Sequence, residues 1–295
     1  MSARRGVSRA VWLGSLAAAT AVVACVAAPA LGDDAPTAEA AIEQARALVG
    51  QGHQEDAEAY LADLVREGEG PHEGSATVLL EAARLSTSVE DCKTYAARAI
   101  EKTRNSAVLE AAHMLLGDSY FAESLYVSAS LEYEKAARHS SARGPGAADL
   151  KRARSILASG DAGAAVETYR EIADWGATPG EVSAVAGLGL GRALLEVGRP
   201  GEAAEQFETT ARLHEEIEIR APALAGAAES HEVAGQHEDA VVALRRLIAD
   251  CPYSYEAVLA RARLRTYALT DSLALPRADA DTSGAADDAP EAPEQ

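Results

Sequence analysis

Residues 111–137 read AAHMLLGDSYFAESLYVSASLEYEKAA and predict two short helices joined by a tight turn. Apolar and small residues recur at helical spacing on both sides of Ser124. Gly117 in the first helix and Ala129 in the second allow two antiparallel helices to approach closely, while tyrosines such as Tyr133 fill the space around them. We therefore predict that a pair of helices is the structural unit here.

The same pattern recurs along the chain, which makes this pair one unit of an array. A turn residue, usually glycine, is followed five residues later by alanine and nine residues later by a large apolar residue. The matching sets are Gly52-Ala57-Leu61, Ser124-Ala129-Tyr133, Gly160-Ala165-Tyr169, Gly198-Ala203-Phe207 and Gly235-Ala240-Leu244. From Ser124 onward the turns are 36 to 38 residues apart. The gap from Gly52 to Ser124 is twice that period, so we predict a degenerate second unit with helices around 78–85 and 92–100.

The upstream helix of each unit repeats as well. A small residue lies seven positions before each turn, and a second stripe residue lies four positions before it. The small residues are Ala45, Gly117, Ala153, Gly191 and Ala228, and the stripe residues are Leu48, Tyr120, Ile156, Leu194 and His231. Such spacing gives each helix a narrow packing stripe. Each pair then leaves an apolar face that only the next pair can cover, so the units must stack.

With these repeated turns and packing stripes, the chain resembles the tetratricopeptide-repeat family. The resemblance rests on Leu116-Gly117-x-x-Tyr120 with Tyr126, Ala129, Tyr133 and Ala136, on a second match at Gly191, Gly198, Ala203 and Phe207, and on Pro252 at the family's inter-repeat proline position. It implies an all-α solenoid of about six antiparallel helix pairs over residues 37–269, closed by a capping helix at 254–269. The period exceeds the family's usual value of about 34 residues. The usual aromatic residue is also missing at Gln54, Ala162, Pro200 and His237.

Residues 1–32 have the features of a secretory signal, with Arg4, Arg5 and Arg9 before an apolar run and small residues before Asp33. We expect export and cleavage there. An alternative comes from Val22-Val23-Ala24-Cys25, which resembles a bacterial lipobox and would make Cys25 a lipidation site. At the other end, residues 276–295 are rich in Ala, Asp, Glu and Pro and predict a disordered acidic tail; an acidic interaction tail is the alternative.

The composition limits the possible partners. The net charge is −19, with 46 acidic against 27 basic residues. A nucleic-acid binder needs a basic face that neutralises phosphates, so we predict no nucleic-acid partner. The same charge disfavours adsorption to an anionic membrane. Membrane association is expected only if Cys25 is lipidated.

No motif in the sequence predicts catalysis, a cofactor or a metal site. The glycine-rich run from Gly187 to Gly191 falls inside a predicted helix, where close helix packing explains it better than nucleotide binding. His231 and His237 flank the turn at Gly235, and we interpret them as half-buried stripe residues rather than metal ligands. Cys92 and Cys251 lie several repeats apart, which predicts two buried thiols and no disulfide.

The family resemblance implies that the upstream helices line a concave surface where partners bind. Its candidate binding residues are Met114, Asp118 and Phe121, then Leu150, Arg154 and Leu157, then Leu188, Arg192 and Leu195, with Ile42, Arg46 and Val49 before them and Ala225, Glu229 and Glu232 after them. An apolar groove with two arginines suits an amphipathic helix or an acidic extended peptide. Alternatively, the leucines pack between repeats and the arginines are only solvated. The family's Asn- and Lys-based carboxylate clamp is absent, since Asn105 is the only asparagine.

Together these features predict a non-enzymatic protein-interaction scaffold in the bacterial cell envelope, similar in general type to periplasmic repeat proteins. The first alternative is an outer-membrane lipoprotein of an envelope-assembly complex. A more remote one is a repeat platform that belongs to an enzyme.

Overall fold

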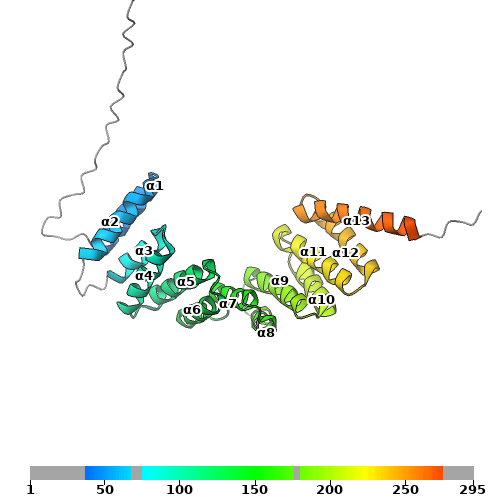
Figure 1. Ribbon diagram of the computed structural model, residues 1–295, viewed down its shortest axis with the longest axis horizontal. Coiled ribbons are helices and arrows are strands. Elements are labelled where there is room, and N and C mark those ends of the chain that lie inside the picture. Colours follow the sequence, from blue (N-terminus) through cyan, green and yellow to red (C-terminus); the bar gives the residue numbers. More distant parts are fainter. Residues whose placement is uncertain (1–36, 68–74, 176–179, 275–295) are drawn as a thin grey trace, which may run out of the picture. The chain divides into compact units, whose positions relative to one another are not determined.

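The computed structural model of this chain describes residues 37–67, 75–175 and 180–274, and within these ranges it consists of thirteen α-helices without strands (Figure 1). The helices are α1 (Ala38–Gly50), α2 (Gln54–Glu67), α3 (Ser75–Leu85), α4 (Val89–Glu101), α5 (Ser106–Ala122), α6 (Tyr126–His139), α7 (Ala147–Ala158), α8 (Ala162–Ala173), α9 (Gly180–Glu196), α10 (Pro200–Leu213), α11 (Ile217–Val233), α12 (His237–Asp250) and α13 (Tyr255–Ala274). The prediction of an all-α repeat fold is confirmed. The proposed signal at 1–32 with Cys25 and the tail at 276–295 lie outside the described residues.

The helices alternate between two roles, and we name them accordingly. The A helices are α1, α3, α5, α7, α9 and α11, and the B helices are α2, α4, α6, α8, α10 and α12. Each helix contacts the next one along the chain, and α9 also contacts both α7 and α11. Stacking on both sides is what lets an alanine-rich helix bury enough surface to be stable.

Five of the six turns that lead from an A helix to its B helix share one backbone conformation. Gly52, Gly160, Gly198 and Gly235 have φ between +75° and +91°, which glycine adopts at little cost. Ser124 takes the same place in its repeat with φ of +61°. In four turns the residue after this position donates its N–H to the carbonyl five residues earlier, as in the bond from Arg199 to Leu194 of 2.9 Å. This is the Schellman arrangement, which satisfies carbonyls at a helix end.

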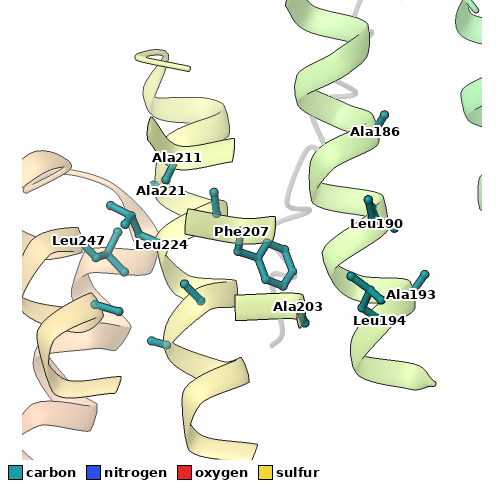
Figure 2. Packing of buried hydrophobic residues seen from close by; sticks show 14 of the residues in the cluster. Ala186, Leu190, Ala193, Leu194, Ala203, Phe207, Ala211, Ala221, Leu224 and Leu247 are labelled. Carbon is teal, nitrogen blue, oxygen red and sulfur yellow. The ribbon is translucent and has the colours of Figure 1, made fainter. Parts of the chain in front are cut away.

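Two apolar cores form within the described residues. The N-terminal core runs from Ala45 to Leu116, and the C-terminal core runs from Ala153 to Ala260. In α6, the buried Ala129, Tyr133 and Ala136 belong to neither core. Figure 2 shows part of the C-terminal core, with the Phe207 ring directed toward α9. The N-terminal core therefore ends within α5, and the buried residues of α6 come between the two cores along the chain.

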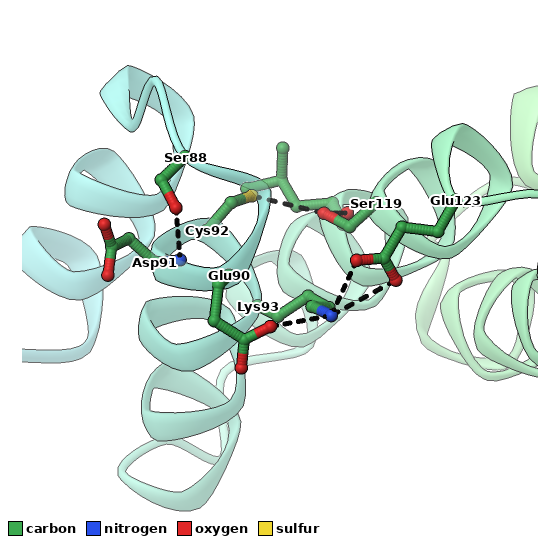
Figure 3. Close-up of polar contacts among 8 residues, drawn as sticks. Ser88, Glu90, Asp91, Cys92, Lys93, Ser119 and Glu123 are labelled. Atoms are coloured by element: carbon green, nitrogen blue, oxygen red, sulfur yellow. Dashed lines mark hydrogen bonds and ion pairs between the residues drawn. The ribbon is translucent and has the colours of Figure 1, made fainter.

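Polar contacts also join neighbouring repeats (Figure 3). The Lys93 ammonium of α4 lies 2.9 Å from Glu123 Oε1 at the end of α5, and Ser119 Oγ donates to Cys92 Sγ at 3.4 Å. Cys92 is half-buried rather than buried as expected, whereas Cys251 is buried, and both are free thiols.

Candidate protein-binding surface

The predicted groove residues occupy equivalent places on five of the six A helices, α3 being the exception. In each of these helices the middle residue of the set is exposed, and the other two are half-buried. The exposed ones are Arg46, Asp118, Arg154, Arg192 and Glu229, and the half-buried ones are Ile42, Val49, Met114, Phe121, Leu150, Leu157, Leu188, Leu195, Ala225 and Glu232. We call these fifteen residues the A-helix row.

The part of the row on α7 and α9 is apolar with two arginines. Leu150 and Leu157 of α7, like Leu188 and Leu195 of α9, are half-buried and pack against the C-terminal core. Arg192 forms no ion pair with any residue in the described part of the chain. The leucines therefore serve the core with one side and leave the other side at the surface.

Arg154 is already in contact with the preceding repeat. Its guanidinium carbon lies 4.9 Å from the centre of the Phe121 ring, and that ring meets Tyr126 edge-on at a centroid distance of 5.1 Å. A guanidinium over an aromatic face is attracted by the ring quadrupole. The Phe121 ring therefore holds the Arg154 guanidinium in place, and the Arg154 side chain remains exposed.

Asp118 is engaged within the protein. Its carboxylate accepts a hydrogen bond from Tyr133 Oη at 2.7 Å and receives Lys151 Nζ at 2.6 and 2.8 Å. Burial raises the pKa of Tyr133, and the neighbouring Asp118 carboxylate raises it further. Asp118 thus links α5 to both α6 and α7. A ligand at this carboxylate would have to compete with two donors.

The degenerate repeat contributes a residue that the sequence did not reveal. Glu81 of α3 is buried and receives Arg46 Nε of α1 at 2.8 Å and Arg84 Nη1 at 3.3 Å. Burial by itself raises the pKa of Glu81, but hydrogen bonds and charges from Arg46 and Arg84 outweigh it and lower that pKa below its ordinary value. Because the second repeat has no glycine turn, its residues could not be aligned with those of the other repeats from the sequence. The contact between Arg46 and Glu81 was therefore not predicted.

At the C-terminal end the row is tied to α13. Glu232 accepts hydrogen bonds from the Arg263 guanidinium and from Tyr267 Oη, the latter at 2.9 Å. Glu229 remains exposed. The acidic end of the row therefore has part of its charge neutralised by the last helix.

The predicted repeat positions lie in the contacts between helices. A Cβ at Gly117 would lie 2.5 Å from Tyr133 Cε1, and one at Gly191 would lie 2.6 Å from Phe207 Cζ. The alanines at 129, 165, 203 and 240 are fully buried, and Tyr169 and Leu244 are buried beside them. Tyr120 is half-buried with Lys93 Nζ over its ring, and Pro252 is half-buried between α12 and α13.

The glycine-rich run of α9 packs closely against neighbouring helices. A Cβ at Gly187 would lie 2.4 Å from Thr210 Oγ1, and one at Gly189 would lie 2.3 Å from Tyr169 Cε1. Together with Gly191 on Phe207, these glycines let α9 contact α8 and α10 closely. The run is part of the fold.

The two histidines beside the turn at Gly235 differ in their surroundings. His231 is half-buried, with Nε2 lying 3.0 Å from Glu208 Oε1 and Nδ1 lying 2.9 Å from Gln236 Oε1. His237 is exposed, so the expectation that it is half-buried is wrong; it begins α12 and only its ring approaches Tyr267. Within the described residues, no three His, Cys, Asp or Glu side chains gather as a metal site would require.

No described helix combines the length and apolar character that crossing a membrane requires. No family model matches the sequence, and no curated protein matches it.

Solved structures do match the fold. A tetratricopeptide repeat protein from Parabacteroides merdae aligns with a TM-score of 0.56 at 16% identity, covering 80% of this chain and 88% of that one. PilW, a type IV pilus biogenesis factor, aligns with a TM-score of 0.53 at 17% identity, covering 77% of this chain and 100% of that one. YrrB, a repeat protein with an unusual peptide-binding site, aligns with a TM-score of 0.49 at 20% identity over 68% of this chain and 97% of its own. The chain has the tetratricopeptide-repeat fold, as the sequence predicts.

Proposed function

We propose that this protein is a protein-interaction scaffold whose A-helix row binds a peptide or helix of a partner protein. The observation that carries the proposal is the surface on α7 and α9, where each exposed arginine lies one helical turn from a half-buried leucine on either side in the sequence. Half-buried leucines offer an apolar contact, and two arginines on adjacent helices can each bind a carboxylate with paired hydrogen bonds. We expect the bound segment to carry apolar residues with at least one acid.

Contacts within the protein favour this segment of the row as the binding surface. Asp118 is occupied by Tyr133 and Lys151, and Glu232 is occupied by Arg263 and Tyr267. Arg192 has no such partner among the described residues, and the Arg154 guanidinium lies over the Phe121 ring. On α7 and α9 the exposed charge of the row is therefore positive, whereas Glu229 on α11 is an exposed acid.

We place this activity in the bacterial cell envelope. Residues 1–32 have the features of an export signal, and a similarly folded protein is a type IV pilus biogenesis factor. Intact mass of the mature protein from its native cells distinguishes cleavage before Asp33 from a lipidated Cys25. Retention of Met1 would remove both versions of the envelope assignment.

Partner capture tests the surface. The variant Arg154→Glu with Arg192→Glu should lose crosslinked partner from native envelopes, because both cationic contacts become repulsive. Arg170→Glu with Arg212→Glu is the matched control, since these arginines lie on B helices and carry the same charge change. Equal loss in both double variants, or no loss in either, would remove the A-helix row as the binding surface.

A further inference from the structure

The last helix, α13, differs from the A helix before it in what covers it. In α11, residues are buried around most of the helix, including Ala221, Ala223, Leu224 and Ala227. In the part of α13 whose side chains the structure describes, only Ala257 and Ala260 are buried. One side of α13 packs on α11 and α12, and no described helix covers its other side.

The uncovered side of α13 is apolar. Tyr255, Val258 and Leu259 are 72%, 57% and 47% exposed, and with the exposed Ala262 they follow the i, i+3, i+4, i+7 spacing of one helix face. Tyr253, just before the helix, is 97% exposed. The helix that ends a repeat array normally presents a polar outer face to water. The charges of α13 do not provide one, because they lie along the edges of this face.

One of these edges is basic, whereas the other carries Glu256 together with Arg263. Arg261 and Arg265 are one helical turn apart along one edge, and Arg263 lies on the other edge, where it binds Glu232. Arg261 donates to the Pro252 carbonyl, and Arg265 has no ion-pair partner in the described ranges. Residues 257–270 contain three arginines and no acid, and Glu256 precedes them in the first turn of the helix.

We propose that this face of α13 binds a partner helix that has an apolar stripe flanked by acidic residues, at a site separate from the A-helix row. Charge complementarity selects this occupant: Arg261 and Arg265, along one edge of the face, attract an acidic flank. The tail after Ala274 is acidic but has only Leu275 as a large apolar residue, so it cannot cover a stripe of Tyr, Val and Leu side chains.

Titration with synthetic helical peptides tests the proposal. One peptide carries a leucine stripe with glutamate flanks, and a second carries the same stripe with lysine flanks. The full chain should bind the glutamate peptide at least about tenfold more tightly. Hydrogen exchange should then show protection in 255–266. No binding, or equal binding of the two peptides, would overturn the proposal.

Variants locate the site and exclude other occupants. Val258→Asp with Leu259→Asp should weaken binding of the glutamate peptide about tenfold or more. Arg265→Glu should reduce the ratio between the affinities for the glutamate and lysine peptides. Val242→Asp, on an exposed valine of α12, should change neither. A dimer that Leu259→Asp dissociates would show that a second copy is the occupant. An affinity gain of tenfold or more on deleting 276–295 would assign the face to the tail; either result contradicts the proposal.

Discussion

Tyr133 and Phe207 occupy the same position in two repeats and bind their neighbours in different ways. Each ring lies against a glycine of its own A helix, Gly117 for Tyr133 and Gly191 for Phe207. Phe207 also meets Gly226 of the next A helix, so the contacts of this ring with the following repeat are apolar. Tyr133 instead places its hydroxyl on Asp118, which Lys151 of the next repeat also contacts.

The difference shows how one repeat pattern yields two kinds of junction. At Phe207 the junction is apolar and belongs to the C-terminal core. At Tyr133 it is aromatic and charged, and it lies where neither core extends. We therefore expect the Phe207 junction to depend on volume and the Tyr133 junction to depend on hydrogen bonds and pH.

Loss of the Phe207 ring should have the largest effect. Phe207→Ala removes a buried aromatic ring that touches two A helices, and such truncations cost about 3–5 kcal/mol. Denaturant unfolding followed by circular dichroism measures this loss. Leu131→Ala, at an exposed position of α6, is the control and should change stability by less than about 0.5 kcal/mol. A loss below 1 kcal/mol for Phe207→Ala would contradict the apolar junction.

Adding one methyl group at Gly191 should cause the next largest loss of stability. Gly191→Ala places a Cβ against Phe207 and should destabilise the protein by about 1–3 kcal/mol. Gly201→Ala is its counterpart in α10, where nothing lies within 4 Å of the added carbon. There alanine should stabilise by about 0.5–1 kcal/mol, because it favours the helix. If both changes had the same sign, helix propensity rather than close approach would explain the glycine.

Removal of one oxygen tests the other junction. Tyr133→Phe keeps the ring on Gly117 but loses the bond to Asp118, which should cost about 0.5–1.5 kcal/mol. Lys151 and Asp118 are 40% and 45% exposed, so their ion pair should contribute less than about 1 kcal/mol. A double-mutant cycle of Tyr133→Phe with Lys151→Met should give a coupling free energy of at least about 0.5 kcal/mol. Strict additivity would mean that Asp118 does not join the repeats.

The turns offer a smaller, opposite pair of changes. Ser124→Gly should stabilise by up to about 1 kcal/mol, because serine with φ of +61° adopts a conformation that glycine reaches without strain. Gly198→Ala should destabilise by about 1 kcal/mol for the same reason. Melting temperatures of the two variants should therefore move in opposite directions. Equal shifts would show that the left-handed turn is not what these positions require.

Acid should weaken the region around Tyr133 selectively. Burial raises the pKa of Glu132, but hydrogen bonds from His113 and Lys135 outweigh it and lower that pKa below its ordinary value of 4.5. Its contribution to stability is therefore present above pH 4.5 and is lost as the pH falls through the folded-state pKa. Hydrogen exchange across that range should accelerate in α6 before α10, and Glu132→Gln should reduce the difference. Simultaneous acceleration in both helices would contradict this account.

Most of the fold could be predicted from the sequence, because glycine turns, buried alanines and a period of 36 to 38 residues are all local signals. The second repeat had no glycine turn, so its helices could be placed but the Arg46–Glu81 pair could not. The positive φ of Ser124 could not be predicted either, because serine rarely adopts that conformation. Helix α13 extends to Ala274 rather than ending at 269, because no proline or glycine interrupts it before Pro276.

The candidate surface was only partly predictable. The resemblance to the tetratricopeptide-repeat family suggested the fifteen residues of the A-helix row, including Arg154 and Arg192. It could not show that Asp118 is occupied by Tyr133 and Lys151, because those partners lie 15 and 33 residues away along the chain. Which row residues remain available depends on contacts between repeats, and these appear only in three dimensions.

Site-specific photocrosslinking tests the central claim that a partner binds on the A helices. A photoreactive residue at position 192 in α9 and another at Glu205, exposed on the B helix α10, can be compared in native cells. We expect a discrete partner adduct from position 192 and none from position 205. Adducts of the same partner at equal yield from both positions, or an adduct from position 205 alone, would contradict the proposal.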